Sequence, residues 1–177
     1  MKILVIESSP HKNGSSNLLA ENFIRGAQEA GHHIDIFDAA HADIHPCIAC
    51  EYCGMSGPCC QNDDMAILRE KILQTDMIVF VTPLYYFGFS SQLKMIIDRF
   101  YSFNGKLSAK GLKTALIVAA WDSNNWTMKD IKSHYQTLCQ YLNFKDQGMV
   151  LAIGCGTVSM TKISSFPKQA YNLGKSL

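Results

Sequence analysis

The segment Lys2-Ile-Leu-Val-Ile6, followed at once by Ser8-Ser-Pro-His-Lys-Asn-Gly-Ser-Ser16, decides how the rest of the chain is interpreted. The first part is an unbroken apolar run and predicts a strand that is buried on both faces. The second part predicts a turn, and apolar residues at helical spacing within 17–27 predict a helix after it. Because a helix begins with free backbone amides and a positive dipole end, this arrangement favours an anion, and a phosphate is the natural guest.

The turn itself supplies further donors for a phosphate. Asn13-Gly14 permits a tight turn with positive φ, and the hydroxyl groups of several serines lie around it in sequence. The residues that we expect to hold a cofactor here are Ser9, His11, Lys12, Asn13, Gly14, Ser15, Ser16 and Asn17. No G-x-G-x-x-G follows the first strand and no G-x-x-x-x-G-K-[ST] occurs anywhere, so a Rossmann dinucleotide site and a P-loop both fit poorly.

Size and charge narrow the class of protein. The chain has 177 residues, of which 47% are hydrophobic, so one domain over residues 1–177 is expected. A formal net charge of +1 with scattered basic residues offers no electrostatic support for binding nucleic acid or an anionic membrane. No apolar run reaches membrane length and no signal-peptide pattern is present, which predicts a cytoplasmic protein with mostly reduced cysteines.

The remaining elements alternate along the chain. Strands are predicted over 33–37, 77–81, 113–120 and 148–153, and helices over 63–73, 92–101, 128–143 and 167–173. Five strands interleaved with helices predict an α/β fold with a doubly wound parallel sheet. Ligands of such sheets lie beyond the carboxyl ends of the strands, so the loops after the first and third strands should meet at one crevice.

The loop after the third strand, Thr82-Pro-Leu-Tyr-Tyr-Phe-Gly-Phe89, carries the second unusual pattern. Its proline restricts the backbone, its aromatic residues offer walls for a flat ring, and Gly88 allows backbone amides to approach closely. An aromatic run after a strand also occurs where it only covers the core. A third loop, 121–126, follows the fourth strand and contains two tryptophans and Asp122, which could contact a ring edge or a substrate.

Two motifs together resemble the flavodoxin-like NAD(P)H-dependent FMN reductases. Ser9-Pro and Lys12-Asn-Gly14 match the phosphate loop of that family, and Thr82 to Lys94 with Ile97-Asp-Arg-Phe100 match its second motif. Ser8, His11 and Ser16 depart from it, standing where glycine, arginine and threonine are usual, so the chain has no permanent cation at position 11.

This resemblance implies a sheet in the order 2-1-3-4-5 and FMN as the cofactor, with NAD(P)H as a transient co-substrate. Hydride would pass through flavin N5 to a small acceptor: a quinone, a nitro or azo compound, a flavin or a metal complex. It also implies a homodimer or higher homo-oligomer and no catalytic side chain. The further cofactor-binding residues that we expect are Pro83, Leu84, Tyr85, Tyr86, Phe87, Gly88, Trp121 and Asp122. Arg99 and its neighbours in the motif are expected to be structural or interfacial.

A cysteine-rich insertion at about 39–62 leaves two alternatives open. The spacing Cys47-x2-Cys50-x2-Cys53-x5-Cys59 suits an iron-sulfur cluster or zinc and resembles the cysteine motif of iron-sulfur flavoproteins, which would make the protein an electron carrier. Plain flavin reductases of the family carry a similar segment without a known cluster, so no metal ligand is assigned. The other alternative is a non-catalytic binding or redox-sensing protein whose thiols are oxidised reversibly.

Overall fold

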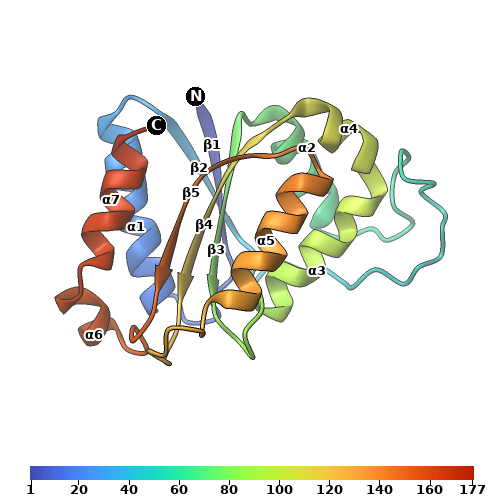
Figure 1. Cartoon of the computed structure of the whole chain (residues 1–177). Helices are drawn as coiled ribbons and strands as arrows, with labels where there is room; N and C mark the ends of the chain where they lie inside the picture. The colour runs from blue at the N-terminus through green and yellow to red at the C-terminus, as the bar shows by residue number, and fades with distance from the viewer.

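Five parallel strands form one sheet in the order β2-β1-β3-β4-β5 in the computed structural model, which describes residues 1–177 (Figure 1). The strands are β1 (Lys2–Glu7), β2 (His33–Asp38), β3 (Met77–Pro83), β4 (Lys113–Ala119) and β5 (Lys145–Ala152). The helices are α1 (Ser15–Glu29), α2 (Met65–Gln74), α3 (Ser91–Arg99), α4 (Asn104–Lys110), α5 (Lys129–Tyr141), α6 (Val158–Ile163) and α7 (Phe166–Lys175). The predicted α/β class and strand order are confirmed.

Helices cover both faces of the sheet, which is why its central strands are apolar throughout. Figure 1 shows α1, α6 and α7 on one side of the sheet and α2, α3, α4 and α5 on the other. In β1, Leu4 and Ile6 belong to the core under α2, α3 and α5, whereas Ile3 and Val5 belong to the core under α1 and α7. The unbroken apolar run at the start of the chain is therefore a strand buried on both faces, as predicted.

Some boundaries differ from the sequence-based prediction. The helix predicted over 92–101 ends at Arg99 and is followed by a 3₁₀ turn, Phe100–Phe103, and by the unpredicted α4, of which only Leu107 is buried. The six-residue α6 was also unpredicted. The strand β5 begins at Lys145, three residues before the predicted start. The prediction missed these residues because they are polar. None of the helices is long and apolar enough to cross a membrane.

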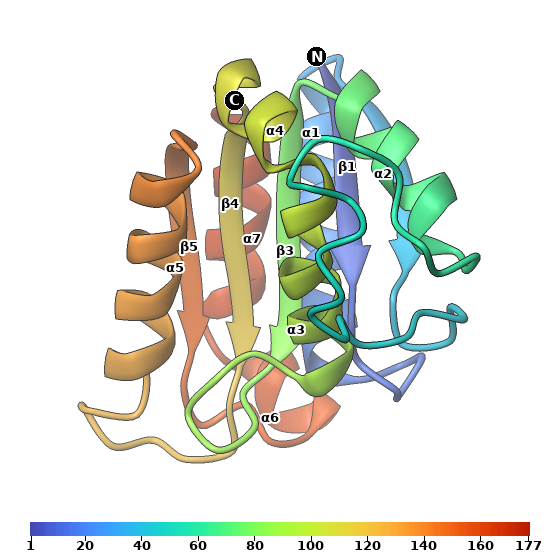
Figure 2. The same ribbon diagram turned by 90° about the vertical axis from the view of Figure 1, so that its right-hand side faces the viewer.

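The carboxyl ends of the strands and the loops that follow them gather at one edge. In Figure 2 the loops after β3 and β4, together with α6, lie at the lower edge of the sheet, where the arrows end. The long segment 39–64 between β2 and α2 instead crosses in front of α3 on one face (Figure 2). We call this segment the cysteine loop. The fold thus keeps the loops after β3 and β4 on a different surface from the cysteine loop, which follows β2.

Candidate functional site

A cavity of about 450 Å³ opens at the carboxyl ends of the strands, and we call it the carboxyl-edge cavity. Fifteen residues from four loops line it: Ser9, His11, Asn13, Gly14, Ser15, Ser16, Pro83, Leu84, Tyr85, Ala119, Trp121, Cys155, Gly156, Thr157 and Val158. The first six come from the loop after β1 and the start of α1, and they make one end of the cavity polar. Proline, leucine and aromatic side chains make the other end largely apolar. The two loops that the sequence predicted to meet do meet here.

The start of α1 leaves backbone donors without partners. Its first intrahelical hydrogen bond runs from Leu18 N to Gly14 O, and no side chain caps the helix. The amides of Ser15, Ser16 and Asn17 therefore have no acceptor within the chain. Gly14 has a φ of −82°, not the positive value that we expected. It is needed for a different reason, since an added Cβ would lie only 3.0 Å from His11 O.

Two predicted residues of this loop lie outside the lining of the cavity. Lys12 is exposed, and Asn17 is buried and turned toward β1, where its Nδ2 donates to Glu7 Oε2 at 2.8 Å. Burial raises the pKa of Glu7, although the hydrogen bond from Asn17 opposes this shift. Asn17 thus ties the first turn of α1 to the end of β1.

Buried hydroxyl groups hold the first and second loops together. Ser8 Oγ donates to Val81 O at 2.9 Å, and Ser90 Oγ donates to Ser8 Oγ at 2.9 Å. The Ser90 amide donates to Thr82 Oγ1 at 3.0 Å, and Ser90 also caps α3 by accepting from Leu93 N. Because these groups are buried, the hydrogen bonds of Ser8 with Val81 and Ser90 fix the relative position of the two loops. Ser90 is thus both the N-cap of α3 and a contact to the first loop.

The second loop forms a tight hairpin that carries its aromatic residues outward. Tyr85 and Gly88 exchange backbone hydrogen bonds of 3.3 and 3.1 Å around Tyr86 and Phe87, whose φ values are +44° and +64°. Left-handed backbone is unusual for aromatic residues and marks a strained turn. Tyr86 is fully exposed, and Phe87 packs on Trp126 with ring centroids 5.3 Å apart. Pro83, Leu84 and Tyr85 line the cavity, whereas Tyr86, Phe87 and Gly88 do not.

Of the two residues predicted in the third loop, one lines the cavity and the other does not. Trp121 lines the cavity and lies so close to Gly156 that a Cβ on that glycine would overlap its ring. Asp122 does not line it but closes its own loop, where Oδ1 accepts from Asn124 Nδ2 at 2.7 Å and Oδ2 accepts from Thr127 Oγ1. The hydrogen bond from Thr127, followed by that from Asn124, lowers the pKa of Asp122. This carboxylate therefore shapes the loop.

Sequence reasoning missed the fourth wall of the cavity. Cys155, Gly156, Thr157 and Val158 follow β5 and lead into α6, and Cys155 is held by its amide, which donates to Ala120 O at 2.7 Å. Cys155 is buried. The available signal was topological: β5 ends at the same edge as β1, β3 and β4, so the residues that follow it had to lie near the other three loops.

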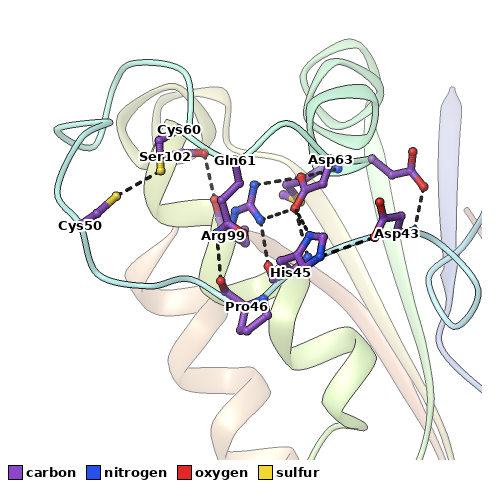
Figure 3. Close-up of polar contacts among 11 residues, drawn as sticks. Asp43, His45, Pro46, Cys50, Cys60, Gln61, Asp63, Arg99 and Ser102 are labelled. Carbon is purple, nitrogen blue, oxygen red and sulfur yellow. Dashed lines mark hydrogen bonds and ion pairs between the residues drawn. The ribbon is translucent and has the colours of Figure 1, made fainter.

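A second cavity of about 480 Å³ lies under the cysteine loop, and we call it the thiol cavity. Its lining includes Cys47, Cys50, Cys53, Cys59 and Arg99, and it shares no residue with the carboxyl-edge cavity. The thiols do not converge on one point: no three His, Cys, Asp or Glu side chains lie close enough to share a metal ion. Cys50 and Cys60, however, have their Sγ atoms 3.3 Å apart (Figure 3).

A buried ion pair anchors the cysteine loop to α3. Arg99 is 2% exposed, and its Nη1 and Nη2 donate to the two carboxylate oxygens of Asp63 at 2.7 and 3.0 Å (Figure 3). Arg99 Nη1 also donates to His45 O at 2.8 Å, so one side chain holds both ends of the loop. Burial alone would raise the pKa of Asp63, but the hydrogen bonds from Arg99 and the His45 amide hold it below its usual range. The expected structural role of Arg99 is confirmed.

The thiols of Cys50 and Cys60 differ in acidity. Hydrogen bonds from the Tyr52 amide and from Cys60 lower the pKa of Cys50. Its contact with Cys50 raises the pKa of Cys60 to about 11. The two sulfurs thus form one interacting unit.

Comparison with known proteins shows which protein family the chain belongs to. The sequence profile described as NADPH-dependent FMN reductase matches residues 1–147. An iron-sulfur flavoprotein of Methanocaldococcus jannaschii is 33% identical over 99 residues, which cover 56% of this chain and 51% of that protein. The Bacillus subtilis protein YwqN, named provisionally as an NAD(P)H-dependent FMN-containing oxidoreductase, is 27% identical over 168 residues, covering 87% of this chain and 86% of YwqN. An NAD(P)H:quinone oxidoreductase from Methanothermobacter marburgensis superposes with a TM-score of 0.81 at 19% identity, covering 99% and 95% of the two chains.

These findings define the class of protein first as a flavodoxin-like α/β protein with its cavity at the carboxyl ends of the strands. Since the family profile covers most of the chain, the chain belongs to the NADPH-dependent FMN reductase family, as the resemblance predicted. That family consists of oxidoreductases that use FMN with NAD(P)H as co-substrate. The chain spans about half the length of the iron-sulfur flavoproteins that it matches.

Proposed function

We propose that this chain is an FMN-dependent NAD(P)H oxidoreductase that holds FMN in the carboxyl-edge cavity. The observation that carries the proposal is that one cavity combines a polar end, built on unpartnered amides of α1, with a largely apolar end. A phosphorylated cofactor with a planar head needs both ends at once. FMN, when bound, supplies the redox chemistry by accepting hydride at N5 and passing two electrons on.

The residues at the polar end suit a phosphate dianion. The Ser15, Ser16 and Asn17 amides lie at the positive end of the α1 dipole, and Ser9, Asn13 and His11 add side-chain donors around them. Ser9 is buried, and its hydroxyl donates to His11 O at 3.3 Å, which holds this side chain in the turn. The role of this end is binding and orientation.

The residues at the apolar end suit a flavin ring. Pro83, Leu84 and Tyr85 come from the second loop, and Trp121 lines the same cavity from the third. Their hydrophobic surfaces would exclude water from one side of a planar ring, and the strand-end backbone would supply hydrogen bonds to its polar edge. We assign no side chain as a general acid or base, and we propose a small planar acceptor of the quinone, nitro or azo class, which these walls could stack against.

An absorbance spectrum of protein purified without oxygen, recorded before and after addition of NADPH or NADH, tests this function. The proposal predicts flavin absorbance that is bleached by the reduced nucleotide and restored by a quinone. Protein that stays colourless after incubation with FMN and gel filtration would contradict it. A homodimer is part of the proposal, because Tyr86 and Trp126 are exposed aromatic residues on the loops after β3 and β4. Light scattering of the flavin-loaded protein checks the mass.

A second candidate function is electron transfer through an iron-sulfur cluster on Cys47, Cys50, Cys53 and Cys59. It is favoured by the fact that all four thiols line one cavity beside the buried guanidinium of Arg99. As arranged, the thiols do not converge, so the loop would have to draw together around a cluster. Iron and acid-labile sulfide in anaerobically purified protein, lost in Cys53→Ser and kept in Cys60→Ser, would support this candidate. Protein without iron after anaerobic reconstitution would exclude it.

A further inference from the structure

The cysteine loop contains a contact between two thiols, Cys50 and Cys60, that neither proposed function explains. Cys50 and Cys60 are both exposed, and their Sγ atoms lie 3.3 Å apart across the loop (Figure 3). Cys60 lies outside the four-cysteine spacing that suits a cluster and outside the lining of the thiol cavity. Its contact with Cys50 is therefore a separate feature of the loop.

The framework of the loop keeps the two thiols opposite each other. Gln61 Nε2 donates to Pro46 O at 2.9 Å, and the His45 amide donates to Asp63 Oδ2 at 3.0 Å (Figure 3). These bonds tie the two arms of the loop together next to the ion pair formed with Arg99. Cys50 and Cys60 follow on the same two arms, so their contact is next to these hydrogen bonds in sequence.

The residues on either side of Cys50 both have unusual backbone angles. Ala49 and Glu51 have φ values of +53° and +58°, in the left-handed region that non-glycine residues seldom adopt. Such backbone costs free energy and persists only where the surrounding structure holds it. Strained backbone held on both sides of a single thiol indicates a feature that the fold maintains.

We propose that Cys50 and Cys60 form a reversible disulfide by exchange with a low-molecular-weight disulfide. One thiolate of the pair attacks a sulfur of the external disulfide and releases one thiol, and the other then attacks the mixed disulfide and releases the second. The pair is oxidised by two electrons, the external disulfide is reduced to two thiols, and the two cysteine protons end on those thiols. A disulfide bond is about 2.05 Å long, so the sulfurs need only a small approach.

The disulfide has a consequence for the thiol cavity but not for the carboxyl-edge cavity. It consumes the sulfur of Cys50, so the oxidised loop cannot offer all four thiols of the spacing that suits a cluster. The two cavities share no lining residue, so flavin binding should be unaffected. The proposal therefore does not rest on the proposed oxidoreductase function, and either can fail alone.

The test is to treat the reduced, full-length protein with glutathione disulfide, alkylate the remaining thiols and analyse the peptides by mass spectrometry. The number of free thiols should fall by two, from the seven cysteines of the chain, with one cross-link between Cys50 and Cys60. Dithiothreitol should restore all seven. Single glutathione adducts on both cysteines without a cross-link would overturn the proposal.

Matched variants separate this pair from its neighbours. In Cys60→Ser, Cys50 should retain a glutathione adduct because no second thiol resolves it, whereas Cys53→Ser should form the same cross-link as the wild type. A cross-link that joins Cys50 to Cys47, Cys53 or Cys59 as often as to Cys60, or one that joins two chains, would contradict the inference. Circular dichroism of each variant verifies that the fold is kept.

Discussion

The carboxyl-edge cavity and the thiol cavity are similar in volume but are built in different ways. The first, about 450 Å³, is made by loops that leave the ends of paired strands, and buried hydroxyls such as Ser8 and Ser90 hold two of those loops in register. The second, about 480 Å³, lies under a long segment without helix or strand and depends on the ion pair of Arg99 with Asp63. The position of the carboxyl-edge cavity is therefore set by the sheet, whereas the thiol cavity depends on a buried contact between the cysteine loop and α3.

Removal of the ion pair between Arg99 and Asp63 should have the largest effect on stability. It should disturb the thiol cavity and leave the carboxyl-edge cavity intact. Arg99→Ala leaves the carboxylate of Asp63 buried without its partner, which typically costs about 3–5 kcal/mol of folding free energy. We expect the cysteine loop to become accessible to protease while FMN affinity, measured below the melting temperature, stays unchanged. Urea unfolding and limited proteolysis measure the two effects.

The control for this variant lies on the same helix. Lys94→Ala breaks an exposed pair with Asp98, which is worth only about 0–1 kcal/mol. Equal destabilisation by Arg99→Ala and Lys94→Ala would contradict the account of the loop.

A substitution at Gly156 should affect only the carboxyl-edge cavity. In Gly156→Ala the new methyl group overlaps the Trp121 ring, and such overpacking costs about 1–3 kcal/mol. We expect Trp121 to be displaced and FMN affinity to fall by about tenfold. Fluorescence titration with FMN measures this loss. Gly105→Ala is the control, since nothing lies within 4 Å of its added Cβ, and a similar loss there would refute the role of Trp121.

The hydroxyl contact between the loops should matter somewhat less. Ser90→Ala removes both the cap of α3 and the hydrogen bond to Ser8, and the loss of such a cap costs about 1–2 kcal/mol. Thermal unfolding checks this value. Ser91→Ala, whose hydroxyl is exposed and bonds only to Gln92, should change stability by less than about 0.5 kcal/mol. The reverse ranking of the two serines would show that the loops are not joined through Ser90.

Mild acidification should have the smallest effect and should act on the cysteine loop. The pKa of Asp63 is depressed in the folded protein, so its stabilisation is fully present above the unfolded pKa of about 3.9 and is lost as the pH falls through the folded pKa. The slope of unfolding free energy against pH below about pH 5 should therefore be shallower in Asp63→Asn than in the wild type. Equal slopes would mean that Asp63 does not carry this acid sensitivity.

Much of the fold could be predicted because its signals are local. The apolar runs of β1, β3 and β4 and the stripe of α1 are visible in the sequence, and the alternation of strands and helices implies their arrangement. The polar start of β5 and the short α4 and α6 were missed because few of their residues are buried, so burial left no periodic pattern.

The candidate site was predicted in part, for a related reason. Residues adjacent to strand ends, such as Ser9 and Pro83, could be placed from topology alone. Within a loop, however, the hairpin geometry decides which side chains face the cavity, and the positive φ values of Tyr86 and Phe87 turn them away. The ion pair of Arg99 with Asp63 joins residues 36 positions apart and had no sequence signal beyond the motif that contains Arg99.

The most direct test of the central claim is a comparison of FMN and riboflavin binding to the wild-type protein by calorimetry. The two ligands share the flavin ring and differ in the phosphate, which the unpartnered amides of α1 are proposed to hold. Hydrogen bonds to a charged group contribute about 1.5–3 kcal/mol, so FMN should bind at least about tenfold more tightly than riboflavin. Equal affinities, or no binding of either flavin, would contradict the account.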